Sequence, residues 1–378
     1  MVHICFLIRQ LNEGGAQRQL ATLVKGLDRS KFNISVMTLY AGGQFCEEIK
    51  RLDHVNYICL EKGGRWDVFP FLFRLIRQAR KLNPDLLHPY LCTANCLSMF
   101  LKLFMPKTRM IFGVRASNMD LSRYDWLARY VYRLECFLSR FADCIIVNSE
   151  AGYEHAVSQG FPRMSMNVVP NGIDIERFKP DRQSGLRVRE EWGVGEKEIL
   201  IGLVGRLDPM KDHPTFLKAA SLLVNKIEHV RFVCLGTGPK PYRDELVATG
   251  NTLGLSDRIF WMNPRSDMPS VYNAFDIVTS SSSFGEGFPN VIGEAMACGV
   301  PCVVTKVGDS SRVVGDTGIV VPPNNPKALA EGWSQILTGD KKQAALQARL
   351  RIQNNFSVNQ LAQRTEKVLN GTLQLMLT

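Results

Sequence analysis

The feature that most constrains this chain is a regular alternation of short apolar runs with longer stretches of helical pattern. The runs occupy residues 4–8, 34–40, 85–88, 110–114 and 144–148 in the first half, and residues 199–204, 231–235, 258–261, 276–279 and 302–305 in the second. They are apolar almost throughout, as parallel strands covered on both faces must be. The alternation therefore predicts an α/β fold with parallel, doubly wound sheets.

The length of the chain predicts two domains. Its 378 residues are too many for one ordinary core and suit two domains of about 150 to 200 residues each. Residues 180–198 are polar and poor in strand formers, so we place the boundary there, with domains at 1–180 and 181–360. The carboxyl ends of the strands should form a binding rim in each domain, and two facing rims would share one site.

Composition excludes several classes of protein. Hydrophobic residues at 45% and charged residues at 22% are ordinary for a chain that folds throughout. The first apolar run lacks the features of a signal peptide, and no run reaches the roughly 18 residues of a spanning helix, so a cytosolic location is expected. The 10 cysteines form no CxxC pair or cluster with histidine, which predicts buried free thiols rather than disulfides or a metal site.

A net charge of +10 is compatible with binding to nucleic acid, with binding to anionic lipid, or with simple solubility. Residues 71–82 and 126–141 each place arginines among aromatic and aliphatic residues at helical spacing. Such helices either lie on a membrane surface or cover a core with snorkelling arginines, and the sequence leaves both interpretations open. No nucleic-acid partner is expected, because basic and aromatic residues are not interleaved along a strand.

Residues 284–301 (FGEGFPNVIGEAMACGVP) form the strongest constellation. Gly285 and Gly287 permit a tight turn after an apolar strand, and Pro289 suits the first position of a helix that ends near Gly299. Free amides around the helix start would favour a phosphate or an anionic leaving group. The segment therefore predicts a diphosphate site formed by Phe288, Pro289, Asn290 and Val291.

Two carboxylates flank this predicted site. Glu286 lies in the turn and Glu294 in the helix, so one could hold the hydroxyls of a hexose and the other those of a ribose. Taken alone, Glu286 is equally an acid stabilised by the helix dipole, and Glu294 a solvated helix residue. The pair fits a sugar nucleotide.

Two further clusters follow predicted strands. Gly205 and Arg206, with Lys211, stand at the start of a loop, where cations can neutralise a phosphate pair and stabilise the charge that develops as a glycosidic bond breaks. Gly14 and Gly15 follow the first strand and allow a ligand to approach the backbone closely. This loop lacks the full GxGxxG fingerprint, so a nicotinamide cofactor is not expected.

These motifs together resemble the large family 4 of retaining GT-B glycosyltransferases. The resemblance runs in the right order from residue 1 to about residue 360. It is carried by Glu286 with Glu294, Gly205–Arg206 with Lys211, residues 170–174 (PNGID) with Phe178 and Pro180, residues 236–239 (GTGP), and residues 14–16 (GGA).

The resemblance implies two Rossmann-like domains, 1–180 on the acceptor side and 181–360 on the donor side, with a helix within 361–378 crossing back to the first. Arg206 and Lys211 would bind the donor diphosphate, Glu294 the ribose and Glu286 the transferred sugar. Backbone amides near residues 288–291 and 15 would assist. The loop that ends at Arg265 would hold the nucleobase of the donor. The donor would be a nucleotide sugar, with UDP as the default, and transfer would retain the anomeric configuration.

Two departures from the family pattern concern the sugar and the acceptor. Many relatives have a histidine after the strand at residues 110–114, whereas this chain continues as Gly-Val-Arg-Ala-Ser-Asn. Arg115, Ser117 and Asn118 are therefore candidates for donor or acceptor contact, or they form a helix cap. Residues 308–312 (GDSSR) replace a Gly-Gly-x-x-Glu pattern, so contacts from that loop are not carried over.

No metal or other cofactor is expected. The chain has no Asp-x-Asp motif, and its 6 histidines form no H-E-x-x-H site. His88 is more readily a hydrogen-bonded core histidine than a ligand of the site. The expected partners are a nucleotide-sugar donor, a glycan or lipid-linked acceptor, and a membrane surface for peripheral contact. A GT-B epimerase or hydrolase of UDP-sugars is the alternative that shares the fold.

Overall fold

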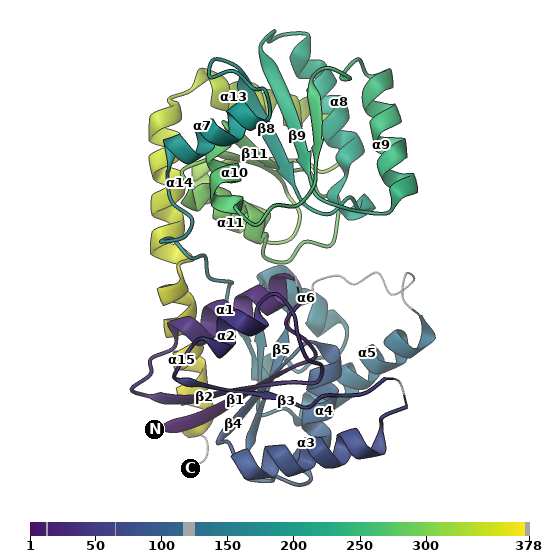
Figure 1. The fold of residues 1–378 in the computed structure, drawn as a ribbon, viewed down its shortest axis with the longest axis vertical. Helices are drawn as coiled ribbons and strands as arrows, with labels where there is room; N and C mark the ends of the chain where they lie inside the picture. Colours follow the sequence, from purple (N-terminus) through teal and green to yellow (C-terminus); the bar gives the residue numbers. More distant parts are fainter. Residues whose placement is uncertain (13, 65, 116–124, 375–378) are drawn as a thin grey trace. The chain divides into compact units, whose positions relative to one another are not determined.

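The computed structural model describes residues 1–12, 14–64, 66–115 and 125–374. The chain forms two compact units, each built on its own parallel sheet (Figure 1). Unit 1 comprises Met1–Gly172 and Val358–Thr378, and unit 2 comprises Ile173–Ser357. The predicted α/β architecture with two Rossmann-like units is confirmed.

Unit 1 contains a parallel sheet of 7 strands in the order β3-β2-β1-β4-β5-β6-β7. The strands are β1 (Val2–Ile8), β2 (Phe32–Thr38), β3 (Val55–Cys59), β4 (Leu86–Tyr90), β5 (Arg109–Val114), β6 (Cys144–Val147) and β7 (Met166–Val168). The helices are α1 (Gly15–Gly26), α2 (Cys46–Lys50), α3 (Phe69–Leu82), α4 (Cys92–Lys102), α5 (Trp126–Leu138), α6 (Glu150–Ser158) and α15 (Val358–Gln374). The sequence analysis missed β3 and β7, which are short and lie at or next to the sheet edges.

The central strand β1 shows why this sheet is covered on both faces. Ile4, Phe6 and Ile8 point to one side, where they pack with residues of α1, α2 and α15. Cys5 and Leu7 point to the other side, where they pack with α3 and α4. Because successive side chains of a strand alternate between faces, an unbroken apolar run can form two cores at once.

Unit 2 contains a parallel sheet of 6 strands in the order β10-β9-β8-β11-β12-β13. The strands are β8 (Ile199–Val204), β9 (Val230–Leu235), β10 (Ile259–Met262), β11 (Ile277–Ser280), β12 (Cys302–Thr305) and β13 (Ile319–Val321). The helices are α7 (Arg182–Glu191), α8 (His213–Val224), α9 (Lys240–Thr252), α10 (Met268–Ala274), α11 (Asn290–Ala297), α12 (Ser310–Val314), α13 (Pro326–Thr338) and α14 (Lys341–Asn355), with the short 3-10 helix η4 (Pro209–Lys211). The edge strand β13 was not predicted.

The chain changes units at Gly172/Ile173 and again at Ser357/Val358. Both changes lie a few residues before the expected boundaries at 180/181 and 360/361. The polar stretch 180–198, where we placed the boundary, contains α7, whose Val188 is buried in the unit 2 core. After the second change, α15 packs beside α1 within unit 1 (Figure 1).

The two basic amphipathic segments form the expected helices, α3 and α5. Within α3, Phe71 and Leu75 are buried, while Phe69 and Phe73 are exposed. Within α5, Tyr132 is buried. Along the described parts of the chain, none of the helices combines the length and the apolar character needed to span a membrane.

Candidate active site

The loop after β8 carries two predicted donor-binding cations. Gly205 and Arg206 follow the strand, and η4 then positions Lys211. A Cβ at Gly205 would lie only 3.2 Å from the Lys211 Cε, so glycine leaves room for that side chain. Arg206 is exposed, whereas the Lys211 side chain is only 15% exposed.

Two aspartates that the sequence analysis did not single out fix this loop. Asp208 Oδ1 accepts a hydrogen bond from the amide of Met210 at 2.9 Å. Asp212 has a left-handed backbone (φ 47°) and caps α8 by accepting from the amide of Thr215 at 3.1 Å. Aspartate is among the few residues that tolerate this conformation, so it ends η4 and starts α8 in a single step.

The turn between β11 and α11 brings Glu286 against Lys211. The Lys211 Nζ lies 2.5 Å from Glu286 Oε1, and Ser282 Oγ donates to the same oxygen at 2.6 Å. The turn needs Gly285, whose φ of 75° is unfavourable for other residues. Glu286 does not cap α11, because the N-cap residue of that helix is Pro289 and no side chain caps it. The carboxylate therefore belongs to a buried polar cluster.

The cluster determines the charge of Glu286. Burial by itself would raise the pKa of this carboxyl group, but the charge and hydrogen bond of Lys211, the Ser282 hydroxyl and the charge of Arg206 together lower its pKa below the usual value. Glu286 is thus ionised at neutral pH. Lys211 and Ser282 both donate to Oε1 of Glu286, so within the described part of the chain Oε2 is the oxygen left for a ligand.

The loop at residues 307–310 supports the backbone of Glu286. A Cβ at Gly308, where φ is 55°, would lie 2.1 Å from the Glu286 carbonyl oxygen. The amide of Asp309 donates to the carbonyl of Gly287 at 3.1 Å. The sequence analysis carried over no contacts from this loop, because it departs from the Gly-Gly-x-x-Glu pattern. The structure shows that it packs directly on the turn.

Helix α11 starts just after Glu286. Its N-cap residue is Pro289, which the sequence analysis placed at the first helical position, so the helix starts one residue later than predicted. Pro289 has no amide hydrogen and so shapes the turn without donating a hydrogen bond. The side chain of Phe288 is buried against Phe356, and Val291 packs on the core, so these two residues can contribute only backbone groups. The amides of Ile292 and Gly293 donate to the Pro289 carbonyl oxygen at 3.1 and 3.3 Å, so an anion at this helix start would meet the amides that precede them.

Glu294 lies one turn further along α11. It is buried, and its Oε2 accepts a hydrogen bond from the Tyr272 hydroxyl at 2.8 Å. The interpretation of Glu294 as a solvated helix residue is therefore wrong. Tyr272, which comes from α10, escaped the sequence analysis because only the tertiary fold brings α10 and α11 together.

Arg265, predicted to bind the donor, is held by acids after β10. Its Nε and Nη2 donate to the two carboxylate oxygens of Asp267, each at 2.8 Å, and its Nη1 donates to Glu191 at 2.5 Å. These acids raise the pKa of Arg265. Each of the three guanidinium nitrogens thus donates to an acid within unit 2, while the neighbouring backbone of the loop lies at the carboxyl edge of the sheet.

In unit 1, Gly14 and Gly15 occupy the start of α1, directly after β1. A Cβ on Gly14 would lie 2.3 Å from Oε1 of the Gln17 side chain, so glycine leaves room for that side chain. The two glycines lie at the carboxyl edge of the unit 1 sheet, the edge at which ligands bind in open α/β sheets.

Arg115 follows β5 at the same edge. Its guanidinium stacks on the Tyr90 ring at 4.5 Å, and its Nη2 donates to the Tyr90 hydroxyl at 2.7 Å. Asp125, and not Arg115, caps α5. Ser117 and Asn118 lie outside the described residues.

His88 is a core residue, as expected. It is fully buried, and its Nδ1 lies 2.7 Å from the carbonyl oxygen of Ile111. Burial, with a smaller contribution from Arg115, lowers the pKa of His88 to about 3. All 10 cysteines are free thiols, and the described residues hold no group of three or more His, Cys, Asp or Glu side chains arranged for a metal.

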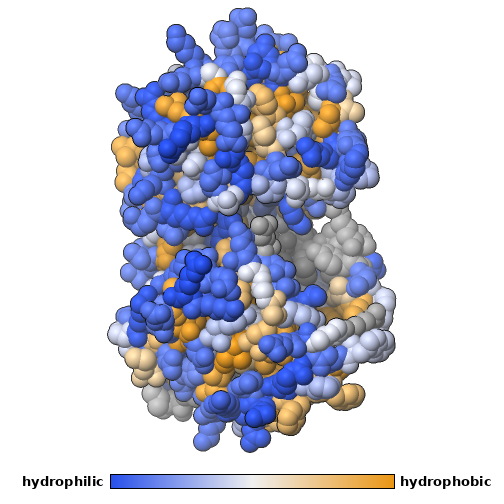
Figure 2. Space-filling view, in the orientation of Figure 1, coloured by the Kyte–Doolittle hydropathy of each residue, from blue (hydrophilic) through white to orange (hydrophobic). Residues whose placement is uncertain are grey.

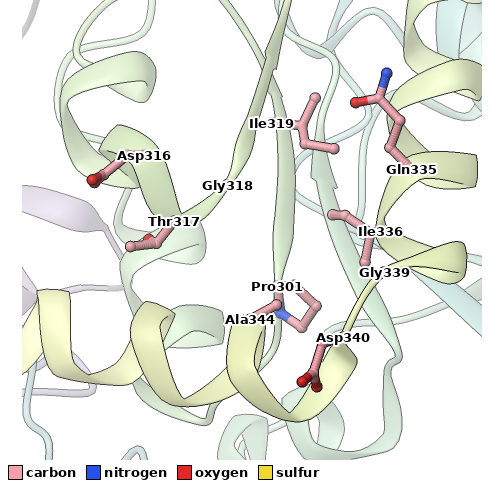
Figure 3. A pocket seen from close by; sticks show the side chains of 10 residues that line it. All are labelled: Pro301, Asp316, Thr317, Gly318, Ile319, Gln335, Ile336, Gly339, Asp340 and Ala344. Carbon is pink, nitrogen blue, oxygen red and sulfur yellow. The ribbon is translucent and has the colours of Figure 1, made fainter.

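A cavity of about 200 Å³ in unit 2 lies away from this cluster (Figure 3). Pro301 and Gly318 in its lining immediately precede β12 and β13, so the cavity is at the amino edge of the sheet. Glu286 and Lys211 follow β11 and β8 and lie at the carboxyl edge. The cavity is therefore not the predicted donor site.

Two family models match the chain. "Glycosyltransferase Family 4" matches residues 13–177, and "Glycosyl transferases group 1" matches residues 198–339. The first match covers most of unit 1 and the second most of unit 2.

The chain is similar to curated D-inositol 3-phosphate glycosyltransferases. It is 35% identical to that of Mycobacterium sp. strain JLS over 189 residues, which are 48% of this chain and 41% of the relative. It is 31% identical to that of Corynebacterium glutamicum strain R over 212 residues, which are 53% and 50% of the two chains. The matched stretches thus span about half the length of these relatives or less.

Among solved structures, Anabaena Alr3699/HepE in complex with UDP superposes with a TM-score of 0.84 at 22% identity, covering 98% of this chain and 100% of that one. Sucrose-phosphate synthase from Thermosynechococcus elongatus superposes with a TM-score of 0.78 at 19% identity, covering 99% and 100%. These likenesses show a shared GT-B fold. With both family models matched in order along the two units, the chain belongs to the family 4, group 1 glycosyltransferases.

Proposed function

We propose that this chain is a retaining, metal-independent glycosyltransferase that moves a sugar from a UDP-sugar to a glycan or lipid-linked acceptor. The observation that carries the proposal is the buried cluster of Lys211, Glu286 and Ser282 at the start of α11. An ionised carboxylate with one free oxygen, a lysine and a row of helix amides together match a sugar joined to a diphosphate.

The cations replace a divalent metal in this mechanism. Arg206 and Lys211 neutralise the diphosphate, and the amides at the start of α11 add the positive end of the helix dipole. Their attraction for the diphosphate grows as the bond to the sugar breaks and negative charge develops on the leaving group, which is the condition for catalysis. Lys211 is already fixed by Glu286, so little reorganisation is needed.

The two carboxylates orient the donor. Glu286 Oε2 accepts hydrogen bonds from hydroxyls of the transferred sugar, and Glu294 accepts from the ribose hydroxyls. The loop that ends at Arg265 holds the nucleobase of the donor. Gly14 and Gly15 let the backbone of unit 1 approach the donor phosphates.

The transfer proceeds with retention. The bond between the sugar C1 and the diphosphate oxygen breaks, and a new bond forms from the acceptor oxygen to C1 on the same face. The acceptor hydroxyl proton passes to the departing diphosphate oxygen. No protein nucleophile is required, in keeping with Glu286 being paired with Lys211.

The choice of UDP rests on the relatives. Anabaena Alr3699/HepE has been solved with UDP-glucose, at a TM-score of 0.81 and 22% identity. The curated relatives are named for an inositol phosphate acceptor, which is a charged polyol.

A donor panel tests the proposal. The protein is incubated with UDP-, GDP- and ADP-sugars and candidate acceptors, UDP release is measured with and without EDTA, and the anomeric configuration of the product is read by NMR. We expect a UDP-sugar to be used, EDTA to have no effect, and an α-donor to give an α-product. An inverted product, or activity lost with EDTA and restored by Mn²⁺, would contradict the mechanism, and acceptor-independent consumption of UDP-sugar would identify an epimerase or hydrolase.

Peripheral contact with the inner face of the cell membrane is the second part of the proposal. Helices α3 and α5 expose Phe69, Phe73, Trp126 and Phe137, each more than half exposed, among basic side chains. Figure 2 shows hydrophobic surface interspersed with hydrophilic surface over unit 1. Exposed aromatic residues beside arginines suit a bilayer interface that contains anionic lipid.

Vesicle sedimentation tests this contact. Vesicles with anionic lipid should sediment the protein at low salt, and neutral vesicles should do so much less. Phe69→Ser combined with Trp126→Ser should weaken sedimentation, whereas Met164→Ser, which removes an equally exposed apolar residue outside both helices, should not. Equal sedimentation of all variants would contradict the proposed surface.

A further inference from the structure

A cavity of about 150 Å³ lies at the carboxyl edge of the unit 1 sheet and takes no part in the donor chemistry described above. Its lining includes Cys92 at the start of α4, Arg115 after β5, Tyr132 and Glu135 from α5, and His155 from α6. A cavity of this volume accommodates a molecule about the size of a six-membered ring. We call it the Arg115 cavity.

Arg115 is the incompletely paired group in this cavity. Its Nη2 donates a hydrogen bond to the Tyr90 hydroxyl, and the Tyr90 ring covers one face of its guanidinium. Its Nε and Nη1 are buried and have no hydrogen-bond partner in the described part of the chain. Buried donors without partners are costly, and those of a guanidinium form a planar fork that matches the two oxygens of a phosphate or carboxylate.

The surroundings of the guanidinium do not cancel its charge. Glu135 is the carboxyl group in the cavity lining, and it is engaged elsewhere, since Asn95 Nδ2 donates to its Oε1 at 2.5 Å. Burial raises the pKa of Glu135, which favours its neutral form, and lowers that of His88. Among the described residues that line the cavity, Arg115 is the one arginine or lysine and is therefore the source of positive charge there.

The start of α4 adds to this field. Its N-cap residue, Leu91, adopts φ 72° and ψ 162° and provides no side-chain cap. The first amides of this 11-residue helix therefore lie beside the cavity that Leu91 and Cys92 help to line. The Tyr132 hydroxyl and His155 Nε2, 3.3 Å apart, supply polar groups suited to ring hydroxyls.

We propose that the Arg115 cavity binds an anionic group of the acceptor, so that the acceptor is a sugar or polyol carrying a phosphate or a carboxylate. This inference rests on the proposed function, because it assigns unit 1 the acceptor of the same transfer. Arg115 pairs through Nε and Nη1 with two oxygens of the anion. Tyr90 holds the guanidinium flat for that contact.

Calorimetric titration at saturating UDP tests the inference. The probes are glucose 6-phosphate, glucuronate, uncharged methyl glucoside and, as a lipid-borne phosphate, a polyprenyl phosphate in detergent. At least one anionic probe should bind tenfold or more tightly than methyl glucoside. Preference for a soluble or a lipid-borne phosphate, or for the carboxylate, then identifies the source of the anion.

Variants at Arg115 give the second readout. Arg115→Gln should weaken the favoured anionic probe at least tenfold and leave the UDP Kd unchanged, and Arg115→Lys should recover part of the loss. The exposed Arg163→Gln serves as the matched control in unit 1. Because two donors of Arg115 are unpaired, Arg115→Gln should also keep or raise Tm, whereas a purely structural arginine would lower it.

The outcomes separate this inference from the proposed function. If UDP binds but no anionic probe is preferred, or if Arg115→Gln binds the preferred probe as wild type does, the acceptor assignment is wrong and the donor site stands. If UDP itself fails to bind, the proposed function fails first.

Discussion

At the scale of single residues, the candidate site is organised around a buried ion pair. Lys211 and Glu286 are each mostly buried and joined at 2.5 Å, and Ser282 adds a neutral donor. A buried ion pair contributes little net stability but becomes very unfavourable when one partner is removed. This pair therefore couples the position of the lysine to that of the carboxylate that we propose binds the donor sugar.

We predict that Lys211→Ala lowers kcat about 10²- to 10³-fold, the usual effect of removing one group that stabilises transition-state charge. It also leaves Glu286 buried without its cation, so Tm should fall. Lys240→Ala is the matched control, because Lys240 forms an exposed ion pair with Asp244. Steady-state kinetics with a UDP-sugar and a thermal melt measure both effects, and near-wild-type turnover of Lys211→Ala would reject the site.

A pH prediction follows from His88. Its pKa is about 3 in the folded chain against an ordinary 6.5, mainly because it is buried. At pH values between 3 and 6.5, His88 binds a proton more readily in the unfolded chain than in the folded one. Its neutral, buried form therefore favours folding fully above pH 6.5, and this contribution to the free energy of unfolding is lost as the pH falls toward 3. Urea unfolding at pH 7.5 and pH 5 should show a smaller drop in the free energy of unfolding for His88→Gln than for wild type. An equal drop would mean that His88 does not titrate this way.

At the scale of elements, two turns on neighbouring strands hold the site. The turn at Gly285 places Glu286, and the loop at Gly308 packs on its carbonyl group. Each turn uses a glycine with positive φ at a point where the backbone passes close to another group. The precision of the site thus depends on contacts between loops as well as on the strands that carry them.

We predict that Gly308→Ala reduces kcat/KM about tenfold or more, because a Cβ there would lie 2.1 Å from the Glu286 carbonyl oxygen and must displace it. The matched control is Gly254→Ala, which has φ 73° with nothing within 4 Å of its Cβ. Gly254→Ala should lose roughly 1–2 kcal/mol of stability for a left-handed alanine, and Gly308→Ala should lose more because of the added clash. If the two variants also have equal activity, the loop does not position Glu286.

At the scale of the whole molecule, each unit has its own cores, and unit 1 is completed by the end of the chain. Helix α15 buries Leu361 and Leu369 with residues of β1 and α1. An ion pair of 3.0 Å joins Lys31, in the turn between α1 and β2, to Glu366 of α15. Unit 1 cannot complete its core until the whole of unit 2 has been synthesised.

We predict that Leu369→Ala lowers the free energy of unfolding by about 2–5 kcal/mol, since the side chain is fully buried and leaves a cavity. Leu350→Ala on α14, where the residue is 38% exposed, should change it by about 0.5 kcal/mol or less. Chemical denaturation followed by fluorescence measures both. Similar values for the two variants would show that α15 contributes little to unit 1.

The sequence alone determined the α/β class, ten of the strands, and the placement of Arg206, Lys211 and Glu286 in loops that follow apolar strands. Each of these follows from local pattern, because strand burial, turn glycines and helix starts are written in neighbouring residues. It missed the edge strands β3, β7 and β13, and it placed the domain boundary in the segment that contains α7, because edge strands and polar helices carry weak periodic signals.

Only the tertiary structure decided which groups meet. Ser282 and Gly308 converge on Glu286, Tyr272 reaches Glu294, and Asp267 and Glu191 occupy Arg265. None of these contacts has a sequence signature, since each joins elements whose separation along the chain says nothing about their distance in space. Local chemistry fixed the kinds of residue at each strand end, and the packing of the elements fixed their partners.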